Sequence, residues 1–118
     1  MKDNPVIKIG LSAQPRETDS VGWTKVKGNP TMKTWVEYTT DDNSTVVGWW
    51  EATPGTYRQS SEAWEFVHLI EGRIVLTPDG GQPVQVGPGD AFVVEKGFKG
   101  IWEIEEKVRK HFVIRRNQ

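Results

Sequence analysis

The stretch that decides the fold class is SEAWEFVHLIEGRIVLT, residues 61–77. A helix is one interpretation of its first part, because a serine could cap its start, a glycine could end it, and apolar residues recur at 63, 66, 67 and 70. The same stretch also alternates as a strand, with Glu65, Val67 and Leu69 on one face and the even-numbered side chains on the other. Periodicity alone leaves both interpretations open, and the β-branched residues after the glycine favour a strand.

Short segments rich in Val, Ile, Thr, Trp or Phe surround this stretch, and glycine and proline separate them. Such a pattern is typical of many strands joined by turns, so the chain is predicted to be all-β. The predicted strands are 34–38 and 45–50, which flank the turn DDNS; 74–76 and 84–86, which flank the turn PDGG; and 91–94, 101–104 and 108–115, the last two separated by a turn at Glu105-Glu106.

Length and composition exclude several classes of protein. The chain has 118 residues, two His, no Cys and a formal net charge of −1. One domain over residues 1–118 is expected at this length, and the lack of Cys excludes a disulfide-stapled scaffold, a zinc finger and a cysteine nucleophile. A nearly neutral chain is not expected to bind nucleic acid. It has neither an apolar run of the ~20 residues that span a membrane nor a hydrophobic signal sequence, so we expect no membrane partner and a cytoplasmic location.

Several stretches between Gly48 and Phe112 resemble those of a cupin. They are GWWEATPG at 48–55, EFVHLIEG at 65–72, RIVLTP at 73–78, GPGD at 87–90, KGFKGIWE at 96–103 and VRKHF at 108–112. More narrowly, the chain is similar to the small cupins related to ureidoglycine aminohydrolase, many of which have no known function. The resemblance implies a double-stranded β-helix, a jelly-roll barrel with a pocket inside, and it makes 61–76 a strand. The first 20 residues look irregular, so we expect an irregular N-terminal arm and first strands over 1–30 and a barrel over 31–118. The resemblance also implies a homodimer.

The metal site of the general cupin pattern lacks most of its ligands in this sequence. That pattern draws three His and one Glu from two motifs, and Glu65 matches the Glu. The two His positions of the first motif fall within residues 58–61, which read RQSS, and the His position of the second falls on Gly100. His68 is expected on the opposite sheet face from Glu65, and His111 lies outside both motifs. One carboxylate cannot hold a divalent ion against water, so we expect no metal and no cofactor.

Glu65 is the candidate catalytic residue. The resemblance implies that its carboxylate points into the barrel without the metal ion that usually neutralises it. Such a carboxylate must pair with a cation, accept several hydrogen bonds, or have a raised pKa. A raised pKa would suit a general acid or base. The alternative is a structural carboxylate paired with Arg58 or another cation.

The candidate ligand-binding residues are Arg58, Trp50, Glu51, Tyr57, Lys96 and Trp102. If residues 55–60 are the loop that enters the barrel, the guanidinium of Arg58 could clamp a carboxylate or phosphate there, with Tyr57 beside it. Otherwise Arg58 is a surface residue. Lys96 could be a second contact for an anion, or a solvated lysine on a glycine-flanked loop.

The six Trp could line the pocket or fill it. Trp102 shares the parity of Gly100 and Ile104, so it is expected to point into the volume that a metal ion and its ligand would fill in a cupin. Trp50 and Glu51 are neighbours on one strand, so only one of them is expected inside. Inward aromatic rings can stack on a planar ligand or surround a cation. The remaining tryptophans are expected to pack in the barrel or at a subunit interface.

Basic residues gather near the C-terminus. They are predicted to form a charged strand edge or tail that discourages uncontrolled strand pairing. The residues are Lys107, Arg109, Lys110, Arg115 and Arg116.

Three functions are compatible with the sequence. The leading hypothesis is a cupin that binds a small polar or anionic metabolite in a metal-free barrel pocket. The second is an enzyme of the aminohydrolase, isomerase or lyase type, with Glu65 as general acid or base. The third is a dimerisation module whose pocket is vestigial.

Overall fold

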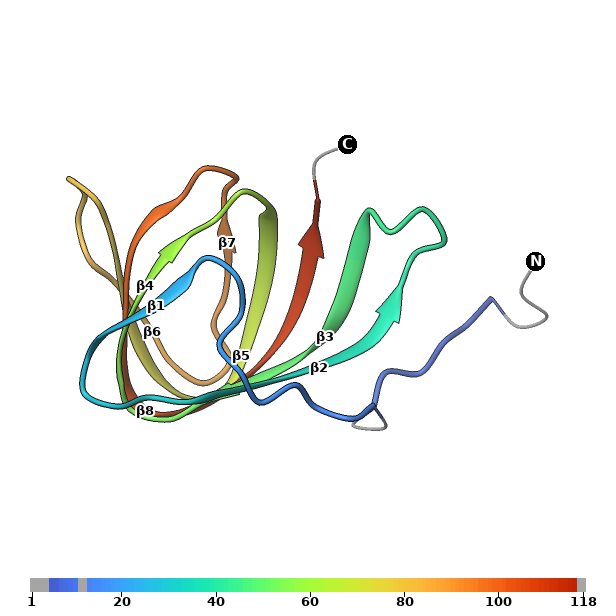
Figure 1. Cartoon of the computed structure of the whole chain (residues 1–118), viewed down its shortest axis with the longest axis horizontal. Helices are drawn as coiled ribbons and strands as arrows, with labels where there is room; N and C mark the ends of the chain where they lie inside the picture. The colour runs from blue at the N-terminus through green and yellow to red at the C-terminus, as the bar shows by residue number, and fades with distance from the viewer. Residues whose placement is uncertain (1–4, 11–12, 117–118) are drawn as a thin grey trace.

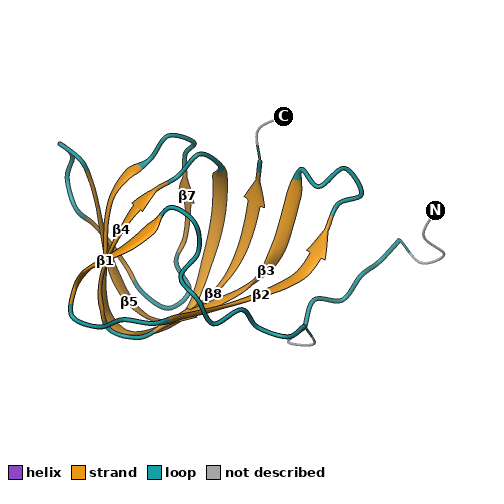
Figure 2. Ribbon diagram, viewed as in Figure 1, coloured by secondary structure: helices purple, strands orange, loops and turns teal. Residues whose placement is uncertain are grey.

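The structure, a computed structural model, describes residues 5–10 and 13–116, and within these ranges it contains eight strands and no helix (Figure 2). All the strand pairings are antiparallel. The all-β prediction is confirmed, and the ambiguous stretch around Glu65 is a strand. The strands are β1 (Trp23–Lys27), β2 (Met32–Thr39), β3 (Thr45–Ala52), β4 (Gly55–Ser60), β5 (Trp64–Pro78), β6 (Val84–Val86), β7 (Ala91–Val94) and β8 (Lys99–Arg115).

Two long strands make the sheet curl into a half-open barrel (Figure 1). β5 has 15 residues and β8 has 17, and they pair from Trp64 opposite Arg115 to Pro78 opposite Gly100. On its other side, β8 pairs with β4 through its first half and with β3 through its second half. Because one strand serves two neighbours along its length, the sheet bends around a concave interior. β2 extends the sheet beyond β3, β1 lies beyond β4, and β6 and β7 pair with β5.

The predicted turn at Glu105-Glu106 is wrong, because β8 runs through both residues without a break. Neither glutamate has the freedom of a glycine or the fixed φ of a proline that a tight turn favours. The chain bends there instead, with register shifts between β5 and β8 on either side of Glu71 and Arg73. Bulges of this kind increase the local twist while keeping the strands paired.

The predicted basic edge is also wrong, because β8 is an interior strand with β3 and β4 on one side and β5 on the other. Lys110, in the middle of this run, is fully buried. Sequence neighbours of like charge therefore lie on opposite faces of one central strand, as strand alternation requires.

Both predicted hairpins are present. In the β2–β3 turn the carboxylate of Asp42 accepts hydrogen bonds from Ser44 N at 3.0 Å, Ser44 Oγ at 2.7 Å and Thr40 Oγ1 at 2.8 Å. These hydrogen bonds, with Ser44 the main donor, lower the pKa of Asp42 to about 2. Asn43 adopts a positive φ of 62° in the same turn, a conformation that asparagine tolerates. The second hairpin pairs Ile74–Leu76 of β5 with β6.

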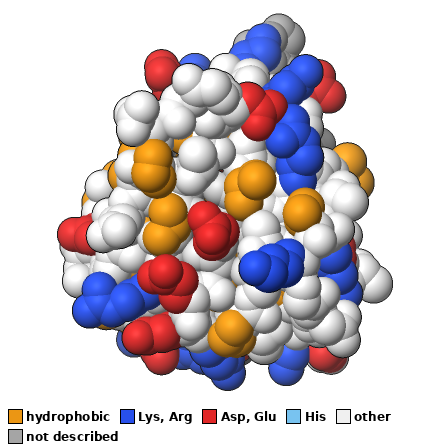
Figure 3. Space-filling model, turned by 90° about the vertical axis from the view of Figure 1, so that its left-hand side faces the viewer, with side chains coloured by type: hydrophobic (Ala, Val, Ile, Leu, Met, Phe, Trp, Pro, Cys, Tyr) orange, Lys and Arg blue, Asp and Glu red, His pale blue; other side chains and the backbone are white. Residues whose placement is uncertain are grey.

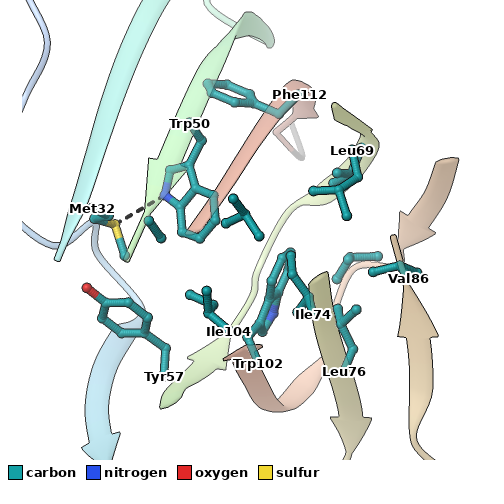
Figure 4. Close-up of a cluster of buried hydrophobic side chains, with 14 of the residues drawn as sticks. Met32, Trp50, Tyr57, Leu69, Ile74, Leu76, Val86, Trp102, Ile104 and Phe112 are labelled. Carbon is teal, nitrogen blue, oxygen red and sulfur yellow. Dashed lines mark hydrogen bonds between the residues drawn. The ribbon is translucent and has the colours of Figure 1, made fainter. Parts of the chain in front are cut away.

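The hydrophobic core fills the concave interior of the curl (Figure 4). Trp102 and Tyr57 are its largest fully buried side chains. At one end, Trp50 Nε1 donates a hydrogen bond of 3.3 Å to the sulfur of Met32, so the indole N–H is not left unpaired. The other core residues are Val46, Ala52, Val67, Leu69, Ile74, Leu76, Val86, Val94, Ile104, Val108 and Phe112.

The described part of the N-terminal arm runs along β2 and β3. Arg16 pairs with Thr34 through two backbone hydrogen bonds of 2.9 Å, and the carbonyl of Gly10 accepts one of 3.2 Å from Trp49 Nε1. No helix in the described part of the chain is long and apolar enough to cross a membrane. Acidic and basic side chains are interspersed over the face where β1, β4 and β6 lie (Figure 3). That face therefore has no electrostatic field of a single sign that would attract a polyanion.

Candidate functional site

A cavity of about 760 Å³ opens into the concave interior between the loop before β1, the loop before β5 and the end of β8. Its inner part is formed by side chains from β1, β2, β3, β4, β5 and β8, so distant segments of the chain meet there. Its lining comprises Ser20, Val21, Gly22, Trp23, Thr34, Trp50, Gln59, Ser60, Ser61, Glu62, Ala63, Glu65, Lys96, Lys110, Phe112, Ile114 and Arg116.

The charged centre of this cavity is an ion pair between Glu65 on β5 and Lys110 on β8. Lys110 Nζ lies 2.8 Å from Glu65 Oε2, and the two residues are 1% and 4% exposed. Lys110 sits opposite Leu69 in the β5–β8 ladder, so its long side chain reaches diagonally across the sheet to Glu65. The cation that compensates Glu65 is thus a lysine 45 residues further along the chain, and not Arg58.

Three tryptophan rings surround the Lys110 ammonium. Its nitrogen lies 4.4 Å from the ring centroid of Trp50, 4.6 Å from that of Trp102 and 5.7 Å from that of Trp23. Aromatic rings at these distances attract a cation through their quadrupole, and more strongly when it is desolvated. Burial nevertheless lowers the pKa of Lys110 below its ordinary value, although the charge and hydrogen bond of Glu65 oppose that shift.

Trp102 and Gln59 form the floor of the site. Trp102 points inward as predicted, is fully buried, and donates a hydrogen bond of 2.7 Å from Nε1 to Gln59 Oε1. Gln59 occupies one of the positions where the cupin pattern would place a histidine. Its amide oxygen is committed to the indole, so both side chains are locked in place.

Thr34 contributes the one buried side-chain polar atom without a hydrogen-bond partner among the described residues. It is Oγ1, and the residue is 7% exposed and lines the cavity. Thr34 lies opposite Trp50, which in turn lies opposite Lys110, so these three side chains follow one row across β2, β3 and β8. Buried polar atoms are paired in nearly all proteins, so this hydroxyl, which no described protein group pairs, is free to form a hydrogen bond with a molecule in the cavity.

Arg58 does not lie in the cavity. The expectation that residues 55–60 form a loop is wrong, because they form β4, whose alternation turns Arg58 outward. Its guanidinium makes two hydrogen bonds to Asp79, of 3.0 Å and 2.6 Å, which raise the pKa of Arg58 and lower that of Asp79. Tyr57 points inward but is sealed in the core, where its hydroxyl donates to Asp19 at 2.8 Å. Burial, and then this contact with Asp19, raises the pKa of Tyr57.

The other predicted ligand-binding residues divide between the cavity and the outer face. Trp50 lines the cavity, and Lys96 lies exposed at its mouth. Glu51 points away from the interior and pairs with Arg109 and, at 3.8 Å, with Lys107. Trp50 and Glu51 therefore obey the expected alternation, with Trp50 inside.

The residues present do not fit the metal site of the cupin pattern. Within the described ranges there is no group of three or more His, Cys, Asp or Glu side chains that could hold a metal ion. A Cβ at Gly100 would collide with the carbonyl oxygen of Thr77 and lie 2.8 Å from Pro78 Cα, so this backbone leaves no room for a histidine there. The cation beside Glu65 is the ammonium of Lys110, which would repel a divalent ion.

Two rows of side chains on the outer face of the sheet are mostly apolar. Across β7, β5, β8, β3 and β2, one row reads Val93, Phe66, Val113, Val47 and Tyr38, and the other reads Ala91, His68, His111, Trp49 and Trp35. Both histidines thus lie outside the cavity. The ring centroids of His111 and Trp49 are 3.6 Å apart. Burial, and then the neighbouring His68, lowers the pKa of His111.

Lys110, Thr34 and Trp23 are the site residues that the sequence did not single out. A signal for Lys110 existed, because it shares the even parity of Trp102, Val108 and Phe112, all of which are inside. Because a turn was predicted at Glu105-Glu106, the alternation was not followed along the strand from Trp102 to Lys110. Thr34 and Trp23 carry no comparable signal, because their place depends on which strands the curl brings together.

Comparisons with known proteins give the fold a family context. The model of the EutQ-like cupin domain matches residues 39–112. None of the curated proteins compared with the chain matches it. The structure is similar to a protein of unknown function from Pseudomonas syringae pv. tomato, with a TM-score of 0.75, 22% identity, and coverage of 90% of this chain and 46% of that one. The chain therefore spans less than half the length of that protein.

Two further solved structures have the same fold. The EutQ protein of Clostridium difficile has a TM-score of 0.65 and 20% identity, with coverage of 74% of this chain and 69% of that one. Ectoine synthase from P. lautus has a TM-score of 0.64 and 18% identity, with coverage of 84% of this chain and 67% of that one. At such identities the likeness establishes the fold and leaves function to the site itself.

Proposed function

The chain belongs to the EutQ-like cupin domain family, and from that premise we propose that it binds a small polar or anionic metabolite, without a metal ion, in the cavity around Lys110 and Glu65. The observation that carries the proposal is the orphaned Thr34 hydroxyl. A buried hydroxyl left unpaired costs roughly 1–3 kcal/mol, and a ligand that supplies its partner would remove that cost.

The charges of the lining favour an anion. Lys96, Lys110 and Arg116 are cationic, and Glu62 and Glu65 are acidic, so the described lining is positive by one charge. Lys110 and Glu65 largely neutralise each other inside. The excess positive charge therefore lies at the mouth, with Lys96 and Arg116.

The aromatic lining favours a ligand with a flat or apolar part. Trp23 and Trp50 both line the cavity, with ring centroids 5.3 Å apart. A small carboxylate or phosphate ester whose body rests on these rings would place a polar group within reach of Thr34. The described lining thus combines aromatic rings with polar and charged side chains that can fix the orientation of a small ligand.

The experiment that tests this proposal is a thermal-shift and calorimetric screen of small carboxylates and phosphate esters, with a chelator present throughout. We expect a subset of the anions to raise the melting temperature, and Thr34→Val to weaken their binding roughly 2- to 10-fold, the worth of one hydrogen bond. Thr53→Val, outside the cavity, is the matched control. Absence of any binding, or binding that needs a divalent ion, would overturn the proposal.

The outer face favours self-association as a second function. We propose that its occupant is a second copy of this chain, because the two rows carry no formal charge at neutral pH, and the charges of Glu51 and Arg109 beside them are already paired within one chain. Phe66 and Val93, on neighbouring strands, are 37% and 48% exposed, so a partner on this face would remove apolar surface from water. Light scattering should show a dimer that Phe66→Lys converts to monomer. A wild-type chain that stays monomeric at high concentration would contradict this.

A further inference from the structure

We propose that Lys110 forms a Schiff base with a small anionic aldehyde or ketone bound in the cavity. This inference rests on the proposed binding function and names the chemical class of its ligand. The structure places a buried primary amine on the wall of a cavity, with a carboxylate in direct contact and three aromatic rings around it.

The first requirement is a free amine, and Glu65 is placed to take up the proton that the ammonium must lose. Glu65 Oε2 lies 2.8 Å from Lys110 Nζ, so it can accept a proton from the ammonium and leave the nitrogen lone pair free. Burial lowers the pKa of this lysine, which makes the neutral amine more accessible than on a solvated lysine. Lys96, the other lysine of the described lining, is exposed to solvent at the mouth of the cavity.

The step balances without any oxidant or reductant. The neutral amine of Lys110 attacks the carbonyl carbon, a C–N bond forms as the C=O π bond breaks, and a proton moves from the nitrogen to the carbonyl oxygen to give a carbinolamine. The protonated Glu65 then donates its proton to that hydroxyl, water leaves, and a C=N bond remains. The net change is the condensation of an amine and a carbonyl to an imine and water, and it is reversible.

The surroundings of Lys110 also suit the product. A protonated imine is a cation in the place of the original ammonium, so the rings of Trp50 and Trp102 and the carboxylate of Glu65 stabilise it in the same way. The acid group of the ligand would point towards the mouth, where Lys96 and Arg116 carry positive charge. Thr34 offers a hydrogen bond beside the ring of Trp50. A polar substituent that takes this bond would lie between the ligand's carbonyl carbon, at Lys110, and its acid group, at the mouth.

The test is reductive trapping of the full chain with pyruvate or glyoxylate and cyanoborohydride at neutral pH, followed by peptide mapping. We expect a single stable adduct at Lys110, formed in preference to the exposed lysines. Lys99→Arg, at an exposed lysine outside the cavity lining, should leave the adduct unchanged, whereas Lys110→Arg should abolish it. Glu65→Gln should slow its formation at least ten-fold.

Peptide mapping of the wild-type chain shows whether the adduct is at Lys110, so the inference can be tested even if Lys110→Arg fails to fold. An adduct spread over exposed lysines, or none at Lys110, overturns the inference. Lactate and glycolate, which lack the carbonyl, separate this result from a failure of binding itself. If lactate or glycolate stabilises the chain and pyruvate gives no adduct, the binding proposal stands and the Schiff base is excluded. If no anion binds and nothing is trapped, both proposals fall.

Discussion

Lys110 and Glu65 form an ion pair of 2.8 Å on the inner face of the sheet, where both residues are almost completely removed from solvent. In the general cupin pattern this glutamate is a metal ligand. In this chain the cation beside it is covalently part of the protein, so the carboxylate is neutralised without any ion from solution. The same replacement puts an amine, instead of a Lewis acid, on the wall of the cavity.

Removal of one member of this pair should destabilise the fold strongly. Lys110→Met keeps the length of the side chain but leaves Glu65 buried without a counter-charge, for which we expect a loss of about 3–5 kcal/mol in the free energy of unfolding. Chemical denaturation measures the change. The double variant with Glu65→Leu should recover most of the loss, because a buried ion pair can often be replaced by apolar side chains. A single variant as stable as the wild type would show that the pair is not buried in solution.

Thr34→Val should have opposite effects on stability and on binding. It removes an unpaired buried hydroxyl at nearly constant side-chain volume. In the absence of ligand, the free energy of unfolding should therefore rise by up to about 1–3 kcal/mol. Thr40→Val is the comparison, because Thr40 Oγ1 donates to Asp42 and that variant should lose stability. A loss of stability in Thr34→Val would mean that its hydroxyl already has a partner in solution.

Gly100 should not tolerate any side chain. An added Cβ would meet the Thr77 carbonyl and the Phe98 ring, the latter at 2.8 Å, so Gly100→Ala should cost about 1–3 kcal/mol or more. Gly10→Ala is the control, because nothing lies within 4 Å of the position of its Cβ. Denaturation curves of the two variants settle the comparison. Equal stability of both would show that β5 can move away from β8.

Stability should fall as the pH drops from 7.5 towards 5. The pKa of His111 is lowered in the folded chain, so the unfolded chain binds the proton more readily and protonation favours unfolding. The contribution of His111 to stability is complete above the ordinary histidine pKa of about 6.5. It is lost as the pH falls through the lower pKa that His111 has in the folded chain. His111→Gln should flatten this part of the stability profile, measured by denaturation at several pH values. An unchanged slope in His111→Gln would show that groups other than His111 produce it.

Much of the architecture follows from local pattern. Alternation in residues 64–70 places Glu65, Val67 and Leu69 on one face, and the structure has all three buried. Both hairpins follow from turn residues with special backbone preferences, and the inward direction of Trp102 follows from parity within one strand. Each of these is decided by neighbours a few residues apart, which is why the sequence was sufficient.

Pairing between distant strands is different, because no local pattern records it. The sequence by itself determined an all-β chain, an inward Glu65 and the loss of the cupin histidines. Only the tertiary structure decided that Arg58 faces outward to Asp79, that Lys110 is the partner of Glu65, and that Trp23, Trp50 and Trp102 surround it. The reason is physical: parity fixes the face on which a side chain lies, whereas the curl of β8 between β3, β4 and β5 fixes which side chains share that face in space.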